Sequence, residues 1–261
     1  MSDDKLWIVC VTYKPNKSHV QKITDLFRDH HVIIADNSVC QSYQSLPKPK
    51  HCTIIPLETN IGYGAGANKG LAYAFKHGAR NVVVINQDVS FTIRSVQALQ
   101  NVCKAQQSGV SGPVLGWIDP VHYSTDLTFR RQELSYVSGS CMVISRDVFD
   151  IIGGFNTSYF MYYEDADMSM RVQMSGFMIK KFSVPGFRHD EKTGKKDPEK
   201  EYYLSRNHLK FMMAFAPFSV RMREFLRIPF RMIRYSKNKN VFALHGVADF
   251  LFGINGKMRE R

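Results

Sequence analysis

The sequence predicts an α/β fold with a Rossmann-like, mostly parallel central sheet flanked by helices. Short apolar runs of strand length alternate with helical patterns through the first half of the chain. Such an alternation is typical of a parallel sheet that is covered on both faces. Residues 206–261 hold twelve Lys/Arg against three Asp/Glu, interleaved with large apolar residues, and this predicts a C-terminal basic helical segment.

The first half contains four expected strands and two expected helices. The strands are 6–11, 32–35, 53–56 and 81–85. One helix covers 20–27, and the glycine-rich segment 60–70 opens the other. Thr12, Asp36 and Asp88 follow three of the strands, so we expect a ligand site at the carboxyl edge of the sheet.

The second half is less regular, with expected strands at 136–145 and 178–184 and expected helices at 146–152 and 165–175. We divide the chain into a main domain and an appended segment. The main domain is 1–205, in two halves of about 1–115 and 116–205, and the basic amphipathic helical extension is 206–261.

Bulk properties narrow the classes of function. The five cysteines are odd in number, scattered and never in a CxxC pair, which argues against a disulfide framework or zinc cluster and fits a reducing cytosol. The start of the chain lacks the pattern of a signal peptide, and no apolar run approaches the length of a membrane span. The net charge of +12 indicates anionic partners: nucleotides, nucleic acid or an acidic membrane surface.

The glycine-rich segment between Asn60 and Gly70 precedes a helix. Glycines there let backbone N–H groups approach a diphosphate closely. The spacing of Gly62, Gly64 and Gly66 departs from the Rossmann fingerprint, and no Gly-Lys-Ser/Thr ending marks a P-loop. A flexible turn that opens a helix is an equally good interpretation of this segment alone.

Two residues are candidate metal ligands. Asp88 follows a buried strand within Asn86-Gln87-Asp88, where a carboxylate suits Mg²⁺ or Mn²⁺ bridging two phosphates. The alternative for an isolated motif of this kind is a capping or turn aspartate. His189 lies near another strand end, and an ordinary surface or core histidine is an equal alternative there.

An acidic stretch, 164–167, follows the aromatic run 159–163. Carboxylates beside aromatic side chains in a cleft have raised pKa values, which suits a general base. The alternative is an acidic first helical turn stabilised by the helix dipole. We assign the chemical role to Asp165 and structural roles to Glu164 and Asp167, with Arg171 placed to pair with Asp167 along the helix.

Taken in order, these residues resemble glycosyltransferase family 2, and within it the bacterial rhamnosyltransferase-like group. The resemblance runs in register from residue 6 to about residue 210. It is carried by Thr12-Tyr13, Asp36-Asn37-Ser38, Asn60-x-Gly62-x-Gly64-x-Gly66-x-Asn68-x-Gly70, Asn86-Gln87-Asp88, Val137-Ser138-Gly139-Ser140 with Met142, Gly153-Gly154-Phe155, Phe160-Met161-Tyr162-Tyr163-Glu164-Asp165-x-Asp167, Arg171, Gly176-Phe177, His189 and Tyr203-x-x-Arg206-Asn207.

The resemblance implies a type A glycosyltransferase fold with a nucleotide-diphosphate sugar bound across the first strands. The donor-binding residues implied are Thr12, Tyr13, Asp36, Asn37, Asn60, Gly62, Gly66, Asn68, Gln87 and Asp88. Among them, Asp36 is implied to meet the base, and Asp88 together with His189 to hold Mn²⁺ or Mg²⁺ on the diphosphate. Asn86 stands where the family has an acidic residue, so the diphosphate itself is expected to supply some of the oxygen ligands that hold the cation.

On the acceptor side the resemblance implies that Asp165 deprotonates a hydroxyl group. The hydroxyl oxygen then attacks the anomeric carbon in line, which inverts its configuration. The acceptor-binding residues implied are Gly139, Ser140, Tyr162, Glu164 and Arg206. Asn156 replaces the family's usual Asp after Gly-Gly-Phe, which removes one expected acceptor or structural contact.

The preferred reaction is transfer of L-rhamnose from dTDP-rhamnose to a lipid-linked or polysaccharide acceptor in cell-surface glycan synthesis, of which O-antigen is an example. A UDP-sugar, carrying galactofuranose or another hexose, is the alternative donor. A nucleotidylyltransferase would have its glycine-rich loop after the first strand, where this chain has Thr12-Tyr13-Lys14-Pro15. Nucleic acid is not expected as a partner, because no helix-turn-helix, RNP or zinc pattern is present.

The basic segment 218–235 alternates arginine with large apolar residues. Such a stretch suits the interface of an anionic membrane. We expect a cytoplasmic protein, peripheral at the inner face of the cell membrane, because the arginines fall on nearly every helical face. The alternative is a pair of amphipathic helices that pack on the main domain with their arginines solvated.

Overall fold

The computed structural model describes residues 5–38, 49–127, 134–189 and 197–259. A seven-stranded sheet forms its centre, in the order β11-β6-β10-β4-β1-β2-β3. These strands are β1 Trp7–Thr12, β2 His31–Asp36, β3 Cys52–Pro56, β4 Asn81–Asn86, β6 Val110–Gly112, β10 Cys141–Ser145 and β11 Ile179–Lys181. β1 to β4 run parallel, and β10 runs antiparallel to both β4 and β6. The expectation of a mostly parallel sheet is confirmed.

Five helices cover this sheet: α1 Lys17–Leu26, α2 Tyr63–Lys76, α3 Ile93–Ala105, α4 Arg146–Ile152 and α5 Glu164–Met174. Val9 and Val11 of β1 face a core shared with α2, α4 and α5, whereas Ile8 and Cys10 face a core shared with α1 and α3. Both faces of β1 are thus buried, which explains its unbroken apolar run.

The helix α3 was not among the expected elements. It begins with a reciprocal pair of hydrogen bonds in which Thr92 and Ser95 cap each other's backbone N–H groups. Val96, Leu99, Val102 and Cys103 of α3 pack on the core at helical spacing, so the sequence did contain a helical signal here.

The expected strand at 136–145 is wrong. A turn at 138–140 divides it into β9 Ser135–Val137 and β10, and the two pieces belong to different sheets. β9 joins a small antiparallel sheet with β7 Leu115–Ile118 and β8 Thr125–Asp126. The hydroxyl oxygens of Ser138 and Ser140 lie 3.1 Å apart within the turn, so small polar residues sit where the strand would have continued. The strand expected at 178–184 is also short, because β11 ends at Lys181.

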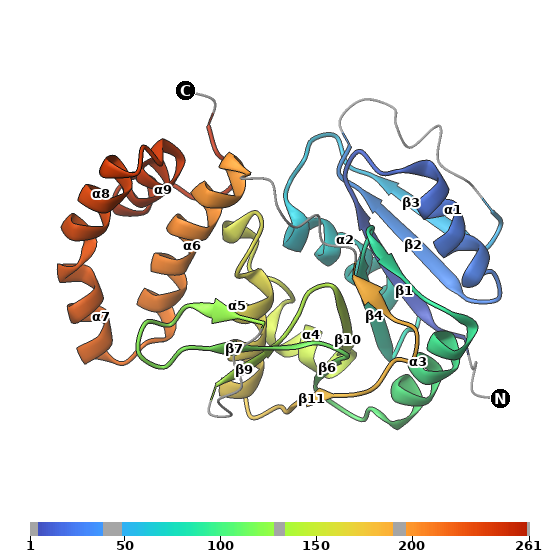
Figure 1. Cartoon of the computed structure of the whole chain (residues 1–261). Coiled ribbons are helices and arrows are strands. Elements are labelled where there is room, and N and C mark those ends of the chain that lie inside the picture. The colour runs from blue at the N-terminus through green and yellow to red at the C-terminus, as the bar shows by residue number, and fades with distance from the viewer. Residues whose placement is uncertain (1–4, 39–48, 128–133, 190–196, 260–261) are drawn as a thin grey trace.

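The C-terminal part consists of α6 Pro198–Phe215, α7 Phe218–Leu226, α8 Ile228–Lys237 and α9 Val241–Leu251. Figure 1 shows these helices, orange to red, at the end of the molecule away from β1 to β3. The expected domain boundary at residue 205 falls inside α6. Leu209 and Phe211 of α6 share an apolar core with Tyr136 and Ala166, and that core also includes Val247 of α9. The helices therefore extend the core of the main domain.

Within the described ranges, no helix combines the length and the apolar character needed to cross a membrane. The described cysteines Cys10, Cys52, Cys103 and Cys141 are free thiols. Cys40 lies outside the described residues.

Candidate active site

The turn at 138–140 joins the two halves of the site. The N–H of Asn86, at the end of β4, donates to the carbonyl of Ser140 at 3.2 Å. The N–H of Gly139 donates to Oδ2 of Asp165 at 2.9 Å. The Tyr63 hydroxyl donates to the Gly139 carbonyl at 2.6 Å. One three-residue turn thus connects the candidate base to the strand end that carries the candidate metal ligand.

Asp165 lies in the first turn of α5 and is partly exposed. Its Oδ1 accepts from the N–H of Ala166 at 2.8 Å, so each carboxylate oxygen accepts one backbone hydrogen bond. Burial raises the pKa of Asp165, and the hydrogen bonds from Gly139 and Ala166 oppose that rise without cancelling it. A fixed carboxylate with raised proton affinity is suited to general-base chemistry.

Glu164, the neighbouring carboxyl, is 7% exposed. Its Oε2 has no hydrogen-bond partner among the residues that the structure describes. Burial, together with the charge of Asp165, raises the pKa of Glu164 to about 8. Both neighbouring carboxyls therefore bind a proton more readily than free carboxyls do. The expected acceptor contact of Glu164 needs correction, because its side chain is buried beside Asp165.

Asp167 has the structural role that we expected. Its Oδ1 accepts from Nε of Arg171 at 2.7 Å, across one turn of α5. Arg171 also donates to the carbonyls of Ile152 and Gly154, so the pair ties α5 to the end of α4.

The aromatic run before α5 has an unusual backbone. Phe160, Tyr162 and Tyr163 all have positive φ angles, of 69°, 63° and 72°. Such values cost energy for bulky side chains and occur where surrounding structure enforces them. Here the Asn207 side chain enforces them, because its Nδ2 lies within hydrogen-bond distance of the carbonyls of Tyr159, Met161 and Tyr162.

Arg206 requires a correction. It is 1% exposed, and its guanidinium donates to the carbonyls of Tyr159 and Gly256 and to the Tyr202 hydroxyl. A buried guanidinium bound to backbone carbonyls has no face left for an acceptor. Arg206 is thus a positioning residue for the aromatic run. Tyr162, in contrast, is partly exposed, and its contact with an acceptor stays a prediction.

Gly139 and Ser140, also expected to contact the acceptor, are buried and contribute their backbone groups to the turn at 138–140. Tyr63 was not among the expected site residues, although it lies in the glycine-rich segment. Its side-chain contact with Gly139 joins residues 76 positions apart, which local sequence does not reveal.

Asp88 and His189 come together, as expected for metal ligands. A short antiparallel pairing of β5 Val89–Ser90 with β12 Arg188–His189 places His189 opposite Val89. The Nε2 atom of His189 lies 3.4 Å from Oδ1 of Asp88 and 3.4 Å from Nδ2 of Asn86. Burial alone would raise the pKa of Asp88, but the hydrogen bond and charge of His189 outweigh it and lower the pKa.

This donor set fits a cation shared with a diphosphate. Oδ1 of Asn86 is buried and accepts no hydrogen bond from any described residue, so an unused oxygen lies beside Asp88 and His189. No group of three or more His, Cys, Asp or Glu side chains suited to a metal occurs among the described residues. Two ligands and an amide oxygen leave coordination positions that oxygen-rich ligands such as phosphates fill.

The residues expected to bind the nucleoside are mostly paired with one another. Thr12 and Asp36 are buried, and the Thr12 hydroxyl donates to Oδ1 of Asp36 at 2.9 Å. The Gln87 amide accepts from the N–H of Tyr13 at 2.8 Å and donates to its carbonyl at 3.1 Å. Gln87 and Asp36 therefore shape the strand ends, while the Tyr13 side chain, 41% exposed, offers a ring surface to a base.

The glycine-rich segment does not form the open phosphate cradle that we expected. Gly62 and Gly66 are buried, and a Cβ at Gly62 would overlap the backbone of Phe160. The N–H of Tyr63, at the start of α2, donates to the Phe160 carbonyl at 2.8 Å. The aromatic run occupies the helix start where an anion would bind, so these glycines permit close packing.

The asparagines of the same segment are also structural. Asn68 donates to the carbonyl of Phe155 and accepts from its N–H, both at 2.8 Å. Asn37 bonds in the same manner to the Gly62 carbonyl and the Ile61 N–H, and Asn60 accepts from the N–H of Gly62. Their amides are thus engaged with backbone groups and replace the expected contacts to the donor.

Known proteins resemble this chain in sequence. It is 25% identical over 222 residues to the N-acetylglucosaminyl-diphospho-decaprenol L-rhamnosyltransferase of Mycobacterium tuberculosis, with 67% of this chain and 72% of the relative covered. It is 22% identical over 235 residues to the dTDP-rhamnosyl transferase RfbF of Shigella flexneri, with 78% and 79% covered. No protein-family model matches the chain.

A solved structure resembles the fold. The mannosyltransferase PcManGT of Pyrobaculum calidifontis, in complex with GDP-Man and Mn²⁺, superposes with a TM-score of 0.56 at 14% identity. The match covers 95% of this chain and 74% of that one. This match and the strand order of the central sheet show the type A glycosyltransferase fold, and the named relatives support a likeness to family 2 glycosyltransferases.

Proposed function

We propose that the protein is an inverting rhamnosyltransferase that moves L-rhamnose from dTDP-rhamnose to a lipid-linked glycan acceptor. The names of the two sequence relatives support rhamnose as the sugar, and one name includes a polyprenyl diphosphate. One observation carries the proposal. The turn at 138–140 binds Asp165 on one side and the end of β4, with its candidate metal ligand, on the other.

On the donor side, Asp88 and His189 would hold Mn²⁺ or Mg²⁺, with the amide oxygen of Asn86 nearby. When bound, such a cation supplies positive charge that stabilises a leaving diphosphate. The exposed Tyr13 ring would contact the base. Gln87 fixes the backbone of Tyr13 through two hydrogen bonds and so orients that ring.

On the acceptor side, Asp165 would take the proton from the acceptor hydroxyl. The hydroxyl oxygen forms a bond to the anomeric carbon while the bond from that carbon to the diphosphate oxygen breaks. The electron pair of the broken bond leaves with the nucleoside diphosphate. Attack from the face opposite the leaving group inverts the anomeric configuration.

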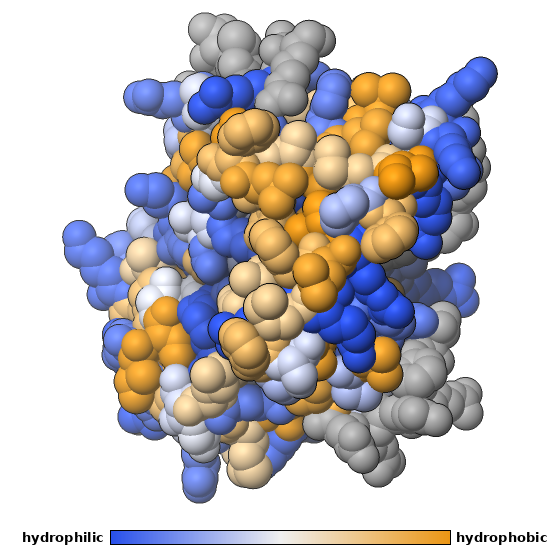
Figure 2. Space-filling model, turned by 90° about the vertical axis from the view of Figure 1, so that its left-hand side faces the viewer, coloured by the Kyte–Doolittle hydropathy of each residue, from blue (hydrophilic) through white to orange (hydrophobic). Residues whose placement is uncertain are grey.

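The association with a membrane would use the C-terminal helices. Phe218, Leu226 and Phe230 on α7 and α8 are 77%, 66% and 70% exposed. Figure 2 shows hydrophobic and hydrophilic surface side by side across the face formed by the C-terminal helices. This pattern supports a peripheral position at an anionic cytoplasmic leaflet.

A donor panel on a polyprenyl-diphosphate-linked acceptor tests the reaction. We expect turnover of dTDP-rhamnose that requires Mn²⁺ or Mg²⁺ and gives the inverted anomer, as measured by the NMR coupling of the product. Turnover of a UDP-hexose with dTDP-rhamnose inert would replace the proposed donor by the alternative one. Release of pyrophosphate instead of a nucleoside diphosphate would show nucleotidyl transfer and would refute the proposal.

A further inference from the structure

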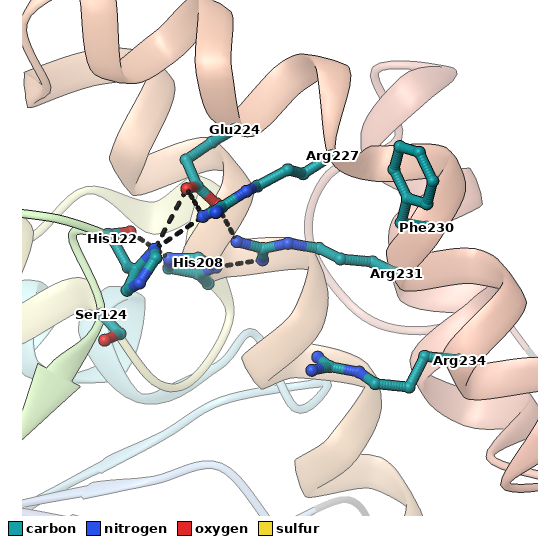
Figure 3. A pocket seen from close by; sticks show the side chains of 8 residues that line it. All are labelled: His122, Ser124, His208, Glu224, Arg227, Phe230, Arg231 and Arg234. Atoms are coloured by element: carbon teal, nitrogen blue, oxygen red, sulfur yellow. Dashed lines mark hydrogen bonds and ion pairs between the residues drawn. The ribbon is translucent and has the colours of Figure 1, made fainter.

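A cavity lies between the C-terminal helices and the loop that precedes β8 (Figure 3). It has a volume of about 660 Å³. We call it the arginine pocket. Its lining residues are His122, Ser124, His208, Glu224, Arg227, Phe230, Arg231 and Arg234.

One carboxylate organises the arginine pocket. Glu224 is fully buried, and its Oε1 accepts from Nη1 of Arg227 at 2.9 Å and lies 3.0 Å from Nδ1 of His122. Its Oε2 accepts from Arg231. Burial alone would raise the pKa of Glu224, but the hydrogen bonds from His122 and Arg227 and the charge of Arg231 lower it to about 2. Glu224 is therefore ionised and already neutralised.

The positive charges around the arginine pocket outnumber the single negative charge of Glu224. Three arginines line the cavity against one acid, and Arg223, outside the lining set, also pairs with Glu224 at 3.3 Å. The Arg234 guanidinium lies 5.5 Å from the ring centroid of Tyr235, has no carboxylate partner within the described ranges, and reaches toward the cavity in Figure 3. Net positive charge thus remains in a partly enclosed space, where screening by water is reduced.

His208 adds no further charge. Burial lowers its pKa to about 4. Its Nε2 lies 2.7 Å from the His122 carbonyl, and its Nδ1 lies 3.0 Å from Nη1 of Arg231. A neutral ring that donates to the carbonyl and accepts from the arginine satisfies both contacts. Arg231 is thereby held between Glu224 and His208, pre-organised for an anion.

One exposed aromatic side chain lines the arginine pocket, and other exposed apolar side chains lie on the same helices. Phe230 lines the cavity and is 70% exposed, and Leu226 and Ile233 on the same two helices are 66% and 52% exposed. A cationic interior beside exposed apolar side chains fits an amphiphile that has an anionic head and an apolar tail. Guanidinium groups recognise phosphate oxygens through paired hydrogen bonds.

Tyr163 links the arginine pocket to the acidic pair. The ring of His208 lies 6.1 Å from the ring of Tyr163, which immediately precedes Glu164 and Asp165. The N–H of Thr125, next to the lining residue Ser124, lies 3.4 Å from the Tyr163 hydroxyl oxygen. One aromatic residue therefore separates the wall of the arginine pocket from the acidic pair.

We propose that the arginine pocket binds the diphosphate of the lipid-linked acceptor and so presents the attached sugar to Asp165, while the lipid chain leaves across Phe230. The inference rests on the proposed lipid-linked acceptor. It adds a site, the recognised chemical group and the direction from which the acceptor enters.

Binding of farnesyl diphosphate to the full chain tests the inference without any turnover. Arg234→Ala removes from the arginine pocket a cation that does not pair with Glu224. Lys237→Ala is the matched control, because Lys237 lies one turn further along α8, is exposed and does not line the cavity. We expect calorimetry to show at least ~5-fold weaker binding in Arg234→Ala, as for loss of one charge-assisted contact, and no change in Lys237→Ala. Equal affinities in the two variants would overturn the assignment.

Two further probes identify the source of the phosphate. Inorganic pyrophosphate is expected to compete with farnesyl diphosphate but to bind more weakly, because it lacks the apolar chain. Affinity equal to that of farnesyl diphosphate would reject a lipid ligand. Vesicles of phosphatidylglycerol are expected to bind both variants alike. A loss confined to Arg234→Ala with these vesicles would make the pocket a general site for anionic lipids and refute the diphosphate assignment.

Kinetics separate this inference from the proposed function. With a polyprenyl-diphosphate-linked sugar, Arg234→Ala should raise the KM for the acceptor and leave kcat unchanged. With the same sugar on a neutral alkyl chain, wild type and variant should have the same KM. Absence of turnover with both acceptors would reject the proposed function, whereas the binding measurements would still decide what the arginine pocket recognises.

Discussion

The N–H of Gly139 donates a 2.9 Å hydrogen bond to Oδ2 of Asp165. This bond links the turn between β9 and β10 to the first turn of α5, and the next residue of the turn accepts a hydrogen bond from Asn86 at the end of β4. The carboxylate is thus fixed relative to the central sheet, which carries the donor-side residues. Rigid placement of a reacting group on regular elements is a large source of rate enhancement.

Asp165→Asn should abolish most of the transferase activity while the protein stays folded. An amide cannot take the proton, so we expect kcat to fall by roughly 10²–10⁴. Loss of one backbone hydrogen bond should lower the free energy of unfolding by about 1 kcal/mol. Steady-state kinetics and urea denaturation measure both quantities. Asp147→Asn, at an exposed position of α4, is the control, and full activity in Asp165→Asn would remove the proposed base.

Glu164→Gln should flatten the dependence of stability on pH. The pKa of Glu164 rises from 4.5 to about 8 on folding, so the folded state binds more protons than the unfolded state between these values. The contribution of Glu164 to stability is therefore fully present below pH 4.5 and is lost as the pH rises toward 8 and beyond. Gln carries no proton to lose, so the variant should match wild type near pH 5 and exceed it at pH 9.

Urea denaturation across this pH range checks the effect of Glu164→Gln. Glu58→Gln, at an exposed surface position, provides the comparison and should follow the wild-type curve. Parallel curves for wild type and Glu164→Gln would mean that Glu164 is not the group that titrates.

Asp88→Asn and His189→Gln should each weaken the binding of Mn²⁺ together with dTDP. The two side chains lie 3.4 Å apart, and removal of one ligand leaves too few oxygen and nitrogen donors on the protein. We expect affinity for the cation to fall by at least ~10-fold, measured by calorimetry with Mn²⁺ and dTDP. His77→Gln, at an exposed position after α2, should bind like wild type. Unchanged affinity in both site variants would place the cation elsewhere.

Arg206→Ala should act on stability. The guanidinium holds the carbonyls of Tyr159 and Gly256, and its loss leaves buried acceptors unsatisfied. We expect a decrease of about 2–4 kcal/mol in the free energy of unfolding. Arg206→Lys should restore only part of it, because an ammonium group cannot reproduce the planar fork. An unchanged melting temperature together with a raised KM for the acceptor would instead show that Arg206 binds the acceptor.

The central sheet could be predicted because strands buried on both faces, such as β1 and β4, are apolar throughout. A ligand site at the carboxyl ends of these strands could be predicted from Asp36 and Asp88. Polar residues directly after buried apolar strands in a parallel sheet commonly face a bound ligand. α3 was missed although Val96, Leu99, Val102 and Cys103 repeat at helical spacing and pack on the core. The strand at 136–145 was wrong because whether Ser138-Gly139-Ser140 continues a strand or turns depends on distant partners.

The roles of individual site residues were harder to predict. Asn68 and Arg206 belong to the expected motifs, yet their side chains bind backbone groups 87 and 47 or more residues away. The sequence presents the same residue type for a ligand contact and for such an internal contact. Only the tertiary arrangement distinguishes the two, and it assigns these residues to holding the loops that carry Asp165.

Arg206 and Asn207 lie on α6, and their side chains donate hydrogen bonds to backbone carbonyls of the segment just before the acidic pair 164–165. Residues 159–165 and the C-terminal helices therefore depend on each other structurally. A chimera that exchanges acceptor preference between two such enzymes should carry both segments from the same parent. A graft of the helices alone would separate a catalytic loop from the side chains that keep its carbonyls in place.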